Sequence, residues 1–271
     1  MSFTQRIISS IAMGVILIVS IYYQRIGLIT LMICSQLMII HEISSIPISS
    51  QFFKLRELIG AVSLAIFTSS LFIEQYLPAL IAVIIFSFIS LTIIFSLKGS
   101  PANCLATFVR FLLNSFISGI LITIGHFLIL NQPTLFLTQL FLVIINDSFA
   151  YFCGKLFGKH KLITLSPSKT WEGFVGGGVF TLCLAKPVYL VCNLMIQADQ
   201  QLLEVVAVQA IFVATVAPIG GFFGSLVKRS CGIQDFGKVI PGHGGFLDRL
   251  DCQILTFSVS YFAWCALAFN E

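Results

Sequence analysis

Long apolar runs recur along most of the chain and are separated by short polar or charged stretches. A bilayer core about 30 Å thick needs about 20 apolar residues in a helix. Runs of this length predict about nine membrane-spanning helices, and eight to ten would satisfy the same rule. The predicted spans are residues 7–23, 26–41, 58–76, 79–97, 105–130, 134–152, 174–196, 205–227 and 253–269.

The composition agrees with this pattern. Hydrophobic residues make up 58% of the chain, charged residues only 10%, and the mean hydropathy is +1.02. Because roughly a quarter of the residues of a soluble domain are charged, we expect an all-α, polytopic transmembrane helix bundle whose first span is retained rather than cleaved. The same numbers exclude a disordered chain and a disulfide-stapled secreted module. The eight cysteines form no C-x-x-C pair and are interpreted as small buried apolar side chains.

Lysine and arginine fall almost entirely on one side of the predicted bundle. With nine spans and a cytoplasmic N-terminus, the outer loops receive only Arg25. Since basic loops stay in the cytoplasm, we predict an N-in, C-out topology. The net charge of +4 is scattered over loops, so no nucleic-acid partner is expected. The cytoplasmic side receives Arg6, Lys54, Arg56, Lys98, Lys155, Lys159, Lys161, Lys169, Lys228, Arg229, Lys238 and Arg249.

The polar residues divide the chain into two parts. Residues 1–130 are expected to form N-terminal spans without a catalytic motif, and we interpret His41, Glu42 and His126 there as structural or interfacial. Residues 131–271 carry two polar cytoplasmic loops, 154–173 and 228–251. The absence of an internal repeat weakens a transporter interpretation.

The second loop combines acids, glycines and bases. Asp248 and Asp251 are three residues apart, so a helix would place both on one face. Together with Asp235 they supply the hard oxygen ligands that Mg²⁺ takes beside a polyphosphate. Glycines at 242, 244 and 245 allow positive φ or close backbone approach around His243. A solvated loop that only contacts lipid headgroups is the alternative for any single residue. Four basic residues could balance phosphate charge: Lys228, Arg229, Lys238 and Arg249.

The first loop begins after a polar pair inside an apolar run. Asp147, next to Asn146, is costly in a membrane unless it faces a cavity, an ion or a partner. Ser166 before Pro167 predicts an N-cap and a first helical position, which would create a phosphate-binding helix N-terminus. The alternative is that Ser166 only caps the helix and binds no phosphate. Two G-x-x-x-G pairs predict close helix packing: Gly173 with Gly177, and Gly220 with Gly224.

At these positions the sequence resembles the phosphatidate cytidylyltransferases, also called CDP-diacylglycerol synthases, whose signature is S-x-x-K-R, four residues, K-D, then P-x-H-G-G-x-x-D-R-x-D. The family's lysine before Asp235 is Gln234 here, which removes one positive charge. The G-F-F-x-S form ending at Ser225 is similar to eukaryotic members and implies the endoplasmic reticulum. Signature positions that match are Ser225, Lys228, Arg229, Asp235, Pro241, His243, Gly244, Gly245, Asp248, Arg249 and Asp251. Upstream N-D-x-x-A-Y and S-P-x-K-T-W-E-G blocks match Asn146, Asp147, Ala150, Tyr151, Ser166, Pro167, Lys169, Thr170, Trp171, Glu172 and Gly173.

The resemblance implies a magnesium-dependent nucleotidyltransferase that converts CTP and phosphatidic acid into CDP-diacylglycerol and pyrophosphate in the lipid bilayer. The implied catalytic residues are Asp235, His243, Asp248, Arg249 and Asp251, and the implied magnesium ligands are Asp147, Asp235, Asp248 and Asp251. The implied substrate-binding residues are Ser166, Lys169, Glu172, Ser225, Lys228, Arg229 and Lys238.

Several features stay open at this stage. A second, monovalent ion such as K⁺, the acyl-chain preference and the oligomeric state, including a homodimer, are not fixed by the sequence. Two other functions remain as alternatives. One is another CTP-dependent membrane lipid enzyme of the polyprenol kinase type, and the other is a non-enzymatic lipid-binding or transport protein.

Overall fold

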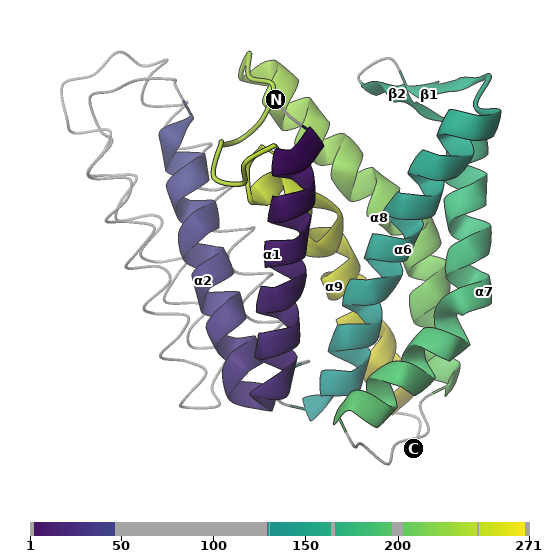
Figure 1. The fold of residues 1–271 in the computed structure, drawn as a ribbon. Coiled ribbons are helices and arrows are strands. Elements are labelled where there is room, and N and C mark those ends of the chain that lie inside the picture. Colours follow the sequence, from purple (N-terminus) through teal and green to yellow (C-terminus); the bar gives the residue numbers. More distant parts are fainter. Residues whose placement is uncertain are drawn as a thin grey trace, which may run out of the picture. The chain divides into compact units, whose positions relative to one another are not determined.

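The structure, a computed structural model, describes residues 3–46, 129, 131–163, 166–196, 203–242 and 244–268. These residues are mostly helical (Figure 1). Two short strands, β1 (Lys161–Ile163) and β2 (Ser166–Thr170), lie between helices α6 and α7 of the list that follows. The helices are α1 (Phe3–Tyr22), α2 (Gln24–Ser45), α6 (Pro133–Phe157), α7 (Trp171–Ile196), α8 (Leu203–Ser230) and α9 (Leu247–Ala268).

Each predicted span that falls on described residues is confirmed as a helix, with somewhat different bounds. Among the described residues, four helices are long and apolar enough to cross a membrane: Gln24–Ile43, Pro133–Phe157, Trp171–Ile196 and Leu203–Ser230. A shorter apolar helix covers Ile8–Tyr22. The predicted spans 58–76 and 79–97, and nearly all of 105–130, lie outside the described residues. The chain is therefore an integral membrane protein of largely helical structure.

The chain forms two compact units, which are described separately. The first contains Met1–Ser20, the segment from Ile26 that includes most of α2, and Cys231–Asp248. The second contains Ile21–Arg25, Phe127–Ser230 and Arg249–Glu271. The unit boundary falls just after the start of α9, so Cys231–Asp248 and the rest of α9 are assigned to different units.

In the second unit, α6, α7 and α8 pack against one another (Figure 1). Glycines allow the closest approach, as the G-x-x-x-G spacing predicts. A Cβ added at Gly173 would lie 2.5 Å from the carbonyl oxygen of Ala150, and one at Gly177 would lie 2.8 Å from that of Asn146. This close packing of α7 on α6 confirms the prediction for the first glycine pair. The apolar core between the helices includes Leu135, Leu142, Val143, Ala185, Tyr189, Val206, Ala210, Val213 and Ala217.

Polar side chains are buried within the same bundle. The Gln209 amide donates hydrogen bonds to the Leu135 carbonyl at 3.0 Å and to the Ser260 hydroxyl at 3.3 Å. Ser260 in turn donates to Oε1 of Gln139 at 2.5 Å. All three side chains are at most 2% exposed. The network therefore links α6, α8 and α9 through groups that have little access to lipid or water.

The first polar loop differs from its prediction. Helix α6 continues to Phe157 and α7 begins at Trp171, and an antiparallel hairpin of β1 and β2 connects them. The described chain is mostly helical, as predicted, but this short hairpin was not predicted. Ser166 was predicted to cap a helix, but it begins β2 and pairs with Ile163. The cap of α7 is Thr170, whose Oγ1 accepts the Gly173 N–H at 3.1 Å. Proline is tolerated near the start of an edge strand, which explains why Ser166-Pro167 does not open a helix here.

Candidate active site

The part of the second loop that belongs to the first unit, Cys231–Asp248, turns back on itself between Ile240 and Gly244. Gly242 and Gly244 have φ angles of +81° and +85°, in the left-handed region that favours glycine. The Ile240 N–H donates to the Gly244 carbonyl at 3.0 Å across the turn. The predicted need for positive φ is confirmed at both glycines. The candidate catalytic residue His243 lies outside the described residues.

This turn also brings Asp235 against Gly244 and Asp248 against Gly245. The Oδ2 atom of Asp248 accepts the backbone N–H groups of Phe236 at 3.0 Å and Gly245 at 2.9 Å. A Cβ at Gly244 would lie 3.1 Å from Cγ of Asp235. The glycines are thus needed because two predicted catalytic acids pack directly on the loop backbone. Asp235 itself is exposed, so its carboxylate is accessible to a ligand.

A third carboxylate, Glu42 of α2, contacts the same turn. Glu42 accepts the N–H groups of Phe246 at 2.6 Å and Leu247 at 2.8 Å, and it is only 1% exposed. The sequence indicates a structural or interfacial role for Glu42 and does not connect it with the catalytic loop. The available signal was a carboxylate near the end of an apolar run, where a buried charge requires a partner.

In the second unit, Asp251 of α9 packs on glycines of α8. A Cβ at Gly220 would lie 2.5 Å from the carbonyl oxygen of Asp251, and one at Gly224 would lie 2.8 Å from its Oδ2. The second G-x-x-x-G pair is therefore confirmed as a site of close helix packing. The packing also places the Asp251 carboxylate against α8, within electrostatic reach of Lys228 near the C-terminal end of that helix.

Lys169 of β2 lies among the acids of the second unit. Its Nζ lies 4.7 Å from the centroid of the Phe222 ring, and a Cβ at Gly221 would approach it to 2.7 Å. Lys169 is within electrostatic reach of Asp147 on α6 and of Asp251. A cation over an aromatic ring beside two carboxylates can hold a phosphate group while remaining oriented by the ring.

Asp147 is exposed although it belongs to the apolar helix α6. Its Oδ1 accepts a weak hydrogen bond from Sγ of Cys252 at 3.9 Å. Arg249, in the first turns of α9, is also within electrostatic reach. The predicted partner for this intramembrane carboxylate is thus a small set of groups at the start of α9 together with Lys169.

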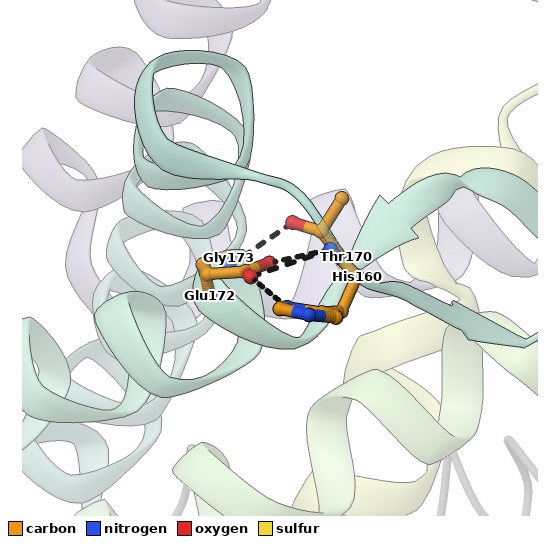
Figure 2. A network of polar contacts seen from close by, with 4 residues as sticks. All are labelled: His160, Thr170, Glu172 and Gly173. Atoms are coloured by element: carbon orange, nitrogen blue, oxygen red, sulfur yellow. Dashed lines mark hydrogen bonds and ion pairs between the residues drawn. The ribbon is translucent and has the colours of Figure 1, made fainter.

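Glu172 joins a network at the junction of the hairpin and α7 (Figure 2). Its Oε1 lies 2.6 Å from Nδ1 of His160, and its two oxygens each lie 3.3 Å from the His160 backbone N–H. Thr170 and Gly173 form the neighbouring cap of α7. The network ties the chain entering β1 to the first turn of α7, so it positions the hairpin that carries Lys169.

The other predicted substrate-binding residues are distributed over both units. Ser225 lies on α8, where its hydroxyl donates to the Gly221 carbonyl at 2.8 Å. Lys228 and Arg229 lie in the last turn of α8, also in the second unit. Lys238 is an exposed residue of the second loop, in the first unit. Ser166 contributes its backbone to β2.

Within the described ranges, no three His, Cys, Asp or Glu side chains are grouped so that they could hold a metal ion. Of the four predicted magnesium ligands, Asp235 and Asp248 belong to the first unit, and Asp147 and Asp251 to the second. Their chemistry fits the ion, because Mg²⁺ takes carboxylate oxygens and both Asp147 and Asp235 are exposed. A shared magnesium site therefore stays a prediction.

Comparison with known proteins gives one family. The family model described as "Cytidylyltransferase family" matches residues 4–267. This match covers nearly the whole chain, including the N-terminal region that carries none of the signature residues. The family assignment therefore does not depend on the two polar loops alone.

Curated eukaryotic proteins are similar to part of the chain. Phosphatidate cytidylyltransferase of Saccharomyces cerevisiae is 37% identical over 171 residues, which are 47% of this chain and 37% of that protein. Phosphatidate cytidylyltransferase 1 of Arabidopsis thaliana is 36% identical over 170 residues, 46% of this chain and 40% of that protein. The human phosphatidate cytidylyltransferase 1 is 35% identical over 164 residues, 44% of this chain and 36% of that protein. The chain thus spans less than half the length of these relatives.

Proposed function

The chain belongs to the cytidylyltransferase family, and from this we propose that it transfers the CMP group of CTP to phosphatidic acid. The products are CDP-diacylglycerol and pyrophosphate. The observation that carries the proposal is that Lys169 of β2 lies within electrostatic reach of both Asp147 on α6 and Asp251 on α9. The names of the relatives in yeast, plant and human support the choice of phosphatidic acid as the acceptor.

The reaction needs positioning and charge stabilisation more than covalent catalysis. A phosphate oxygen of phosphatidic acid attacks the α-phosphorus of CTP in line, the bond from the α-phosphorus to the bridging oxygen breaks, and pyrophosphate leaves with that oxygen. A phosphate monoester is already a nucleophile at neutral pH, so no enzyme-bound intermediate is required. Lys169, Lys228 and Arg229 hold phosphate groups and offset their charge.

We further propose that Mg²⁺ assists this transfer. Asp147, Asp235, Asp248 and Asp251 would hold it, and the ion would supply neutralisation of the charge on the leaving pyrophosphate. Arg249 and His243 would contact phosphate oxygens or orient these acids. Ser166, Glu172, Ser225 and Lys238 would complete the substrate-binding surface, with Glu172 acting through the hairpin network described above.

The finer topology is also a proposal. Nine spans with the N-terminus in the cytoplasm would place both polar loops on the cytoplasmic face of the endoplasmic reticulum, where CTP is available. Tags at the two ends, probed in sealed and permeabilised microsomes, test this orientation. An accessible N-terminal tag and a protected C-terminal tag are expected, and an accessible C-terminal tag in sealed microsomes would show the topology to be wrong.

The position of a phosphorus label distinguishes this function from the kinase alternative. Purified protein in micelles of phosphatidic acid and a polyprenol is given CTP labelled at either the α- or the γ-phosphate. Transfer of CMP leaves the α-label in the lipid product and the γ-label in pyrophosphate. Lipid carrying the γ-label would instead show phosphoryl transfer and refute the proposal.

A further inference from the structure

Helix α9 begins without a local side chain to cap it. Its first helical residue is Leu247, so Phe246 occupies the N-cap position, and phenylalanine offers no acceptor for the exposed N–H groups of a first turn. The residues before it are Gly244 and Gly245, which offer none either. The N–H groups of Phe246 and Leu247 must therefore find an acceptor elsewhere in the chain.

Glu42, 204 residues away in the sequence, supplies this acceptor. Its Oε1 and Oε2 bind the N–H groups of Phe246 and Leu247 at 2.6 Å and 2.8 Å. A carboxylate at a helix N-terminus is favoured by the helix dipole and by charge-assisted hydrogen bonds. These interactions offset the cost of a side chain that is 99% buried, since Glu42 is only 1% exposed.

The second loop is shaped around this carboxylate. A Cβ at Gly237 would lie 2.6 Å from Oε1 of Glu42, and a Cβ at Gly245 would lie 2.8 Å from its Oε2. The same Gly245 gives its N–H to Asp248, whose Oδ2 also accepts the Phe236 N–H. Four N–H groups of one turn are thus divided between Glu42 and Asp248, and the two carboxylates together fix its path.

We propose that Glu42 is a positioning residue of the reaction, which holds the start of α9 so that Asp248 is presented in its working orientation. The inference rests on the proposed function for its catalytic meaning, because Asp248 is the candidate catalytic acid. Glu42 does not touch substrate in this account. It acts through the backbone of Phe246 and Leu247, the residues that directly precede Asp248.

Glu42→Gln tests the contact with nearly unchanged size. An amide offers one oxygen acceptor, so one of the two N–H groups would face a donor instead. Hydrogen–deuterium exchange of the full chain in detergent should become about 10-fold faster in a peptide covering residues 236–247, because local opening becomes easier. In the same variant we expect kcat to fall by about 10-fold or more with a much smaller change in the KM for CTP, as loss of orientation predicts.

Gly237→Ala perturbs the same contact from the side of the loop. It provides a second test if Glu42→Gln does not fold. The added methyl group displaces the Glu42 carboxylate, so it should also speed exchange in the 236–247 peptide and lower kcat. Glu42→Ala removes the carboxylate that the new methyl group would meet. Adding Gly237→Ala to Glu42→Ala should therefore lower kcat little further than Glu42→Ala alone. The matched controls are Glu204→Gln and Gly14→Ala. Glu204 is an exposed carboxylate in the first turn of α8, and a Cβ added at Gly14 has nothing within 4 Å.

The outcomes separate the two proposals. Wild-type exchange of the 236–247 peptide in Glu42→Gln would overturn the positioning role, and so would faster exchange with unchanged kcat. A wild-type protein that forms no CDP-diacylglycerol would refute the proposed function, while the exchange data would still decide whether Glu42 holds the turn. Faster exchange and lower kcat in both variants, with neither change in the controls, would support the proposal.

Discussion

Gly224 packs directly on the carboxylate of Asp251, since a Cβ at Gly224 would lie 2.8 Å from Oδ2 and 3.1 Å from Cβ of that residue. The contact joins α8 to the start of α9. It gives the glycine a specific role, which is to leave room for a candidate catalytic acid between two packed helices. An alanine at this position must move either the acid or the helix.

Gly224→Ala should therefore lower the rate of CDP-diacylglycerol formation by about 10-fold or more, because overpacking typically costs about 1–3 kcal/mol and here displaces Asp251. The measurement is the initial rate in detergent at saturating CTP. Gly178→Ala is the matched control, since its added Cβ would make only an ordinary contact of 3.5 Å with Ala214. Equal activity of the two variants would show that the Gly224 contact does not position the acid.

Lys169→Met should reduce kcat/KM for CTP by about 10- to 100-fold, the loss expected for a charge-assisted hydrogen bond of about 1.5–3 kcal/mol. Methionine keeps the length of the side chain and can still contact the Phe222 ring, but it cannot hold a phosphate. Lys161→Met changes an exposed lysine of the same hairpin and should leave kcat/KM within about twofold. A similar loss in both variants would point to damage of the hairpin rather than to phosphate binding.

The buried network of Gln139, Gln209 and Ser260 should contribute to stability more than to chemistry. Gln209→Leu keeps the approximate volume but removes two hydrogen bonds between helices. Such bonds in membrane proteins contribute about 0.6–1.7 kcal/mol, so a lower unfolding temperature in detergent is expected with little change in KM for CTP.

A double variant checks that this effect passes through Ser260. If the three side chains act as one network, Gln139→Leu combined with Gln209→Leu should destabilise the protein by less than the sum of the single changes. Additive losses, or a Gln209→Leu variant more stable than wild type, would contradict the network interpretation.

Thr170→Val tests the cap that replaces the predicted one at Ser166. Valine keeps the branched shape but loses the Oγ1 acceptor for the Gly173 N–H, and loss of an N-cap typically costs about 1 kcal/mol. We expect faster hydrogen–deuterium exchange at the first turn of α7. Thr215→Val should not alter that exchange, because Thr215 is exposed on α8 and its hydroxyl bonds only within its own helix.

The helices could be predicted from the sequence because a run of about 20 apolar residues has few other structures open to it in a bilayer. The prediction of 205–227 and the observed α8 at Leu203–Ser230 differ only at the ends. The hairpin could not be predicted, since β1 has only three residues and shows no alternation. Ser166-Pro167 fits a helix start and an edge strand equally well, and only the pairing with Ile163 decides between them.

The candidate site was predictable where local spacing determines it. The i, i+3 spacing places Asp248 and Asp251 in the first turns of one helix, and α9 contains both. The glycines at 242 and 244 indicated a turn with positive φ, and both residues have it. The role of Glu42 could not be predicted, because its partners are backbone N–H groups more than 200 residues away and leave no pattern in the side-chain sequence.

The most direct test of the account measures CDP-diacylglycerol and pyrophosphate formed from CTP and phosphatidic acid with Mg²⁺, for wild type and Asp248→Asn. The account predicts equal amounts of the two products from wild type, none after EDTA until Mg²⁺ is restored, and a loss of about 100-fold or more in the variant, as removal of a metal-ligating acid implies. Both proteins should retain the same unfolding temperature within a few degrees. A well-folded wild type that binds phosphatidic acid but forms no CDP-diacylglycerol would contradict the account.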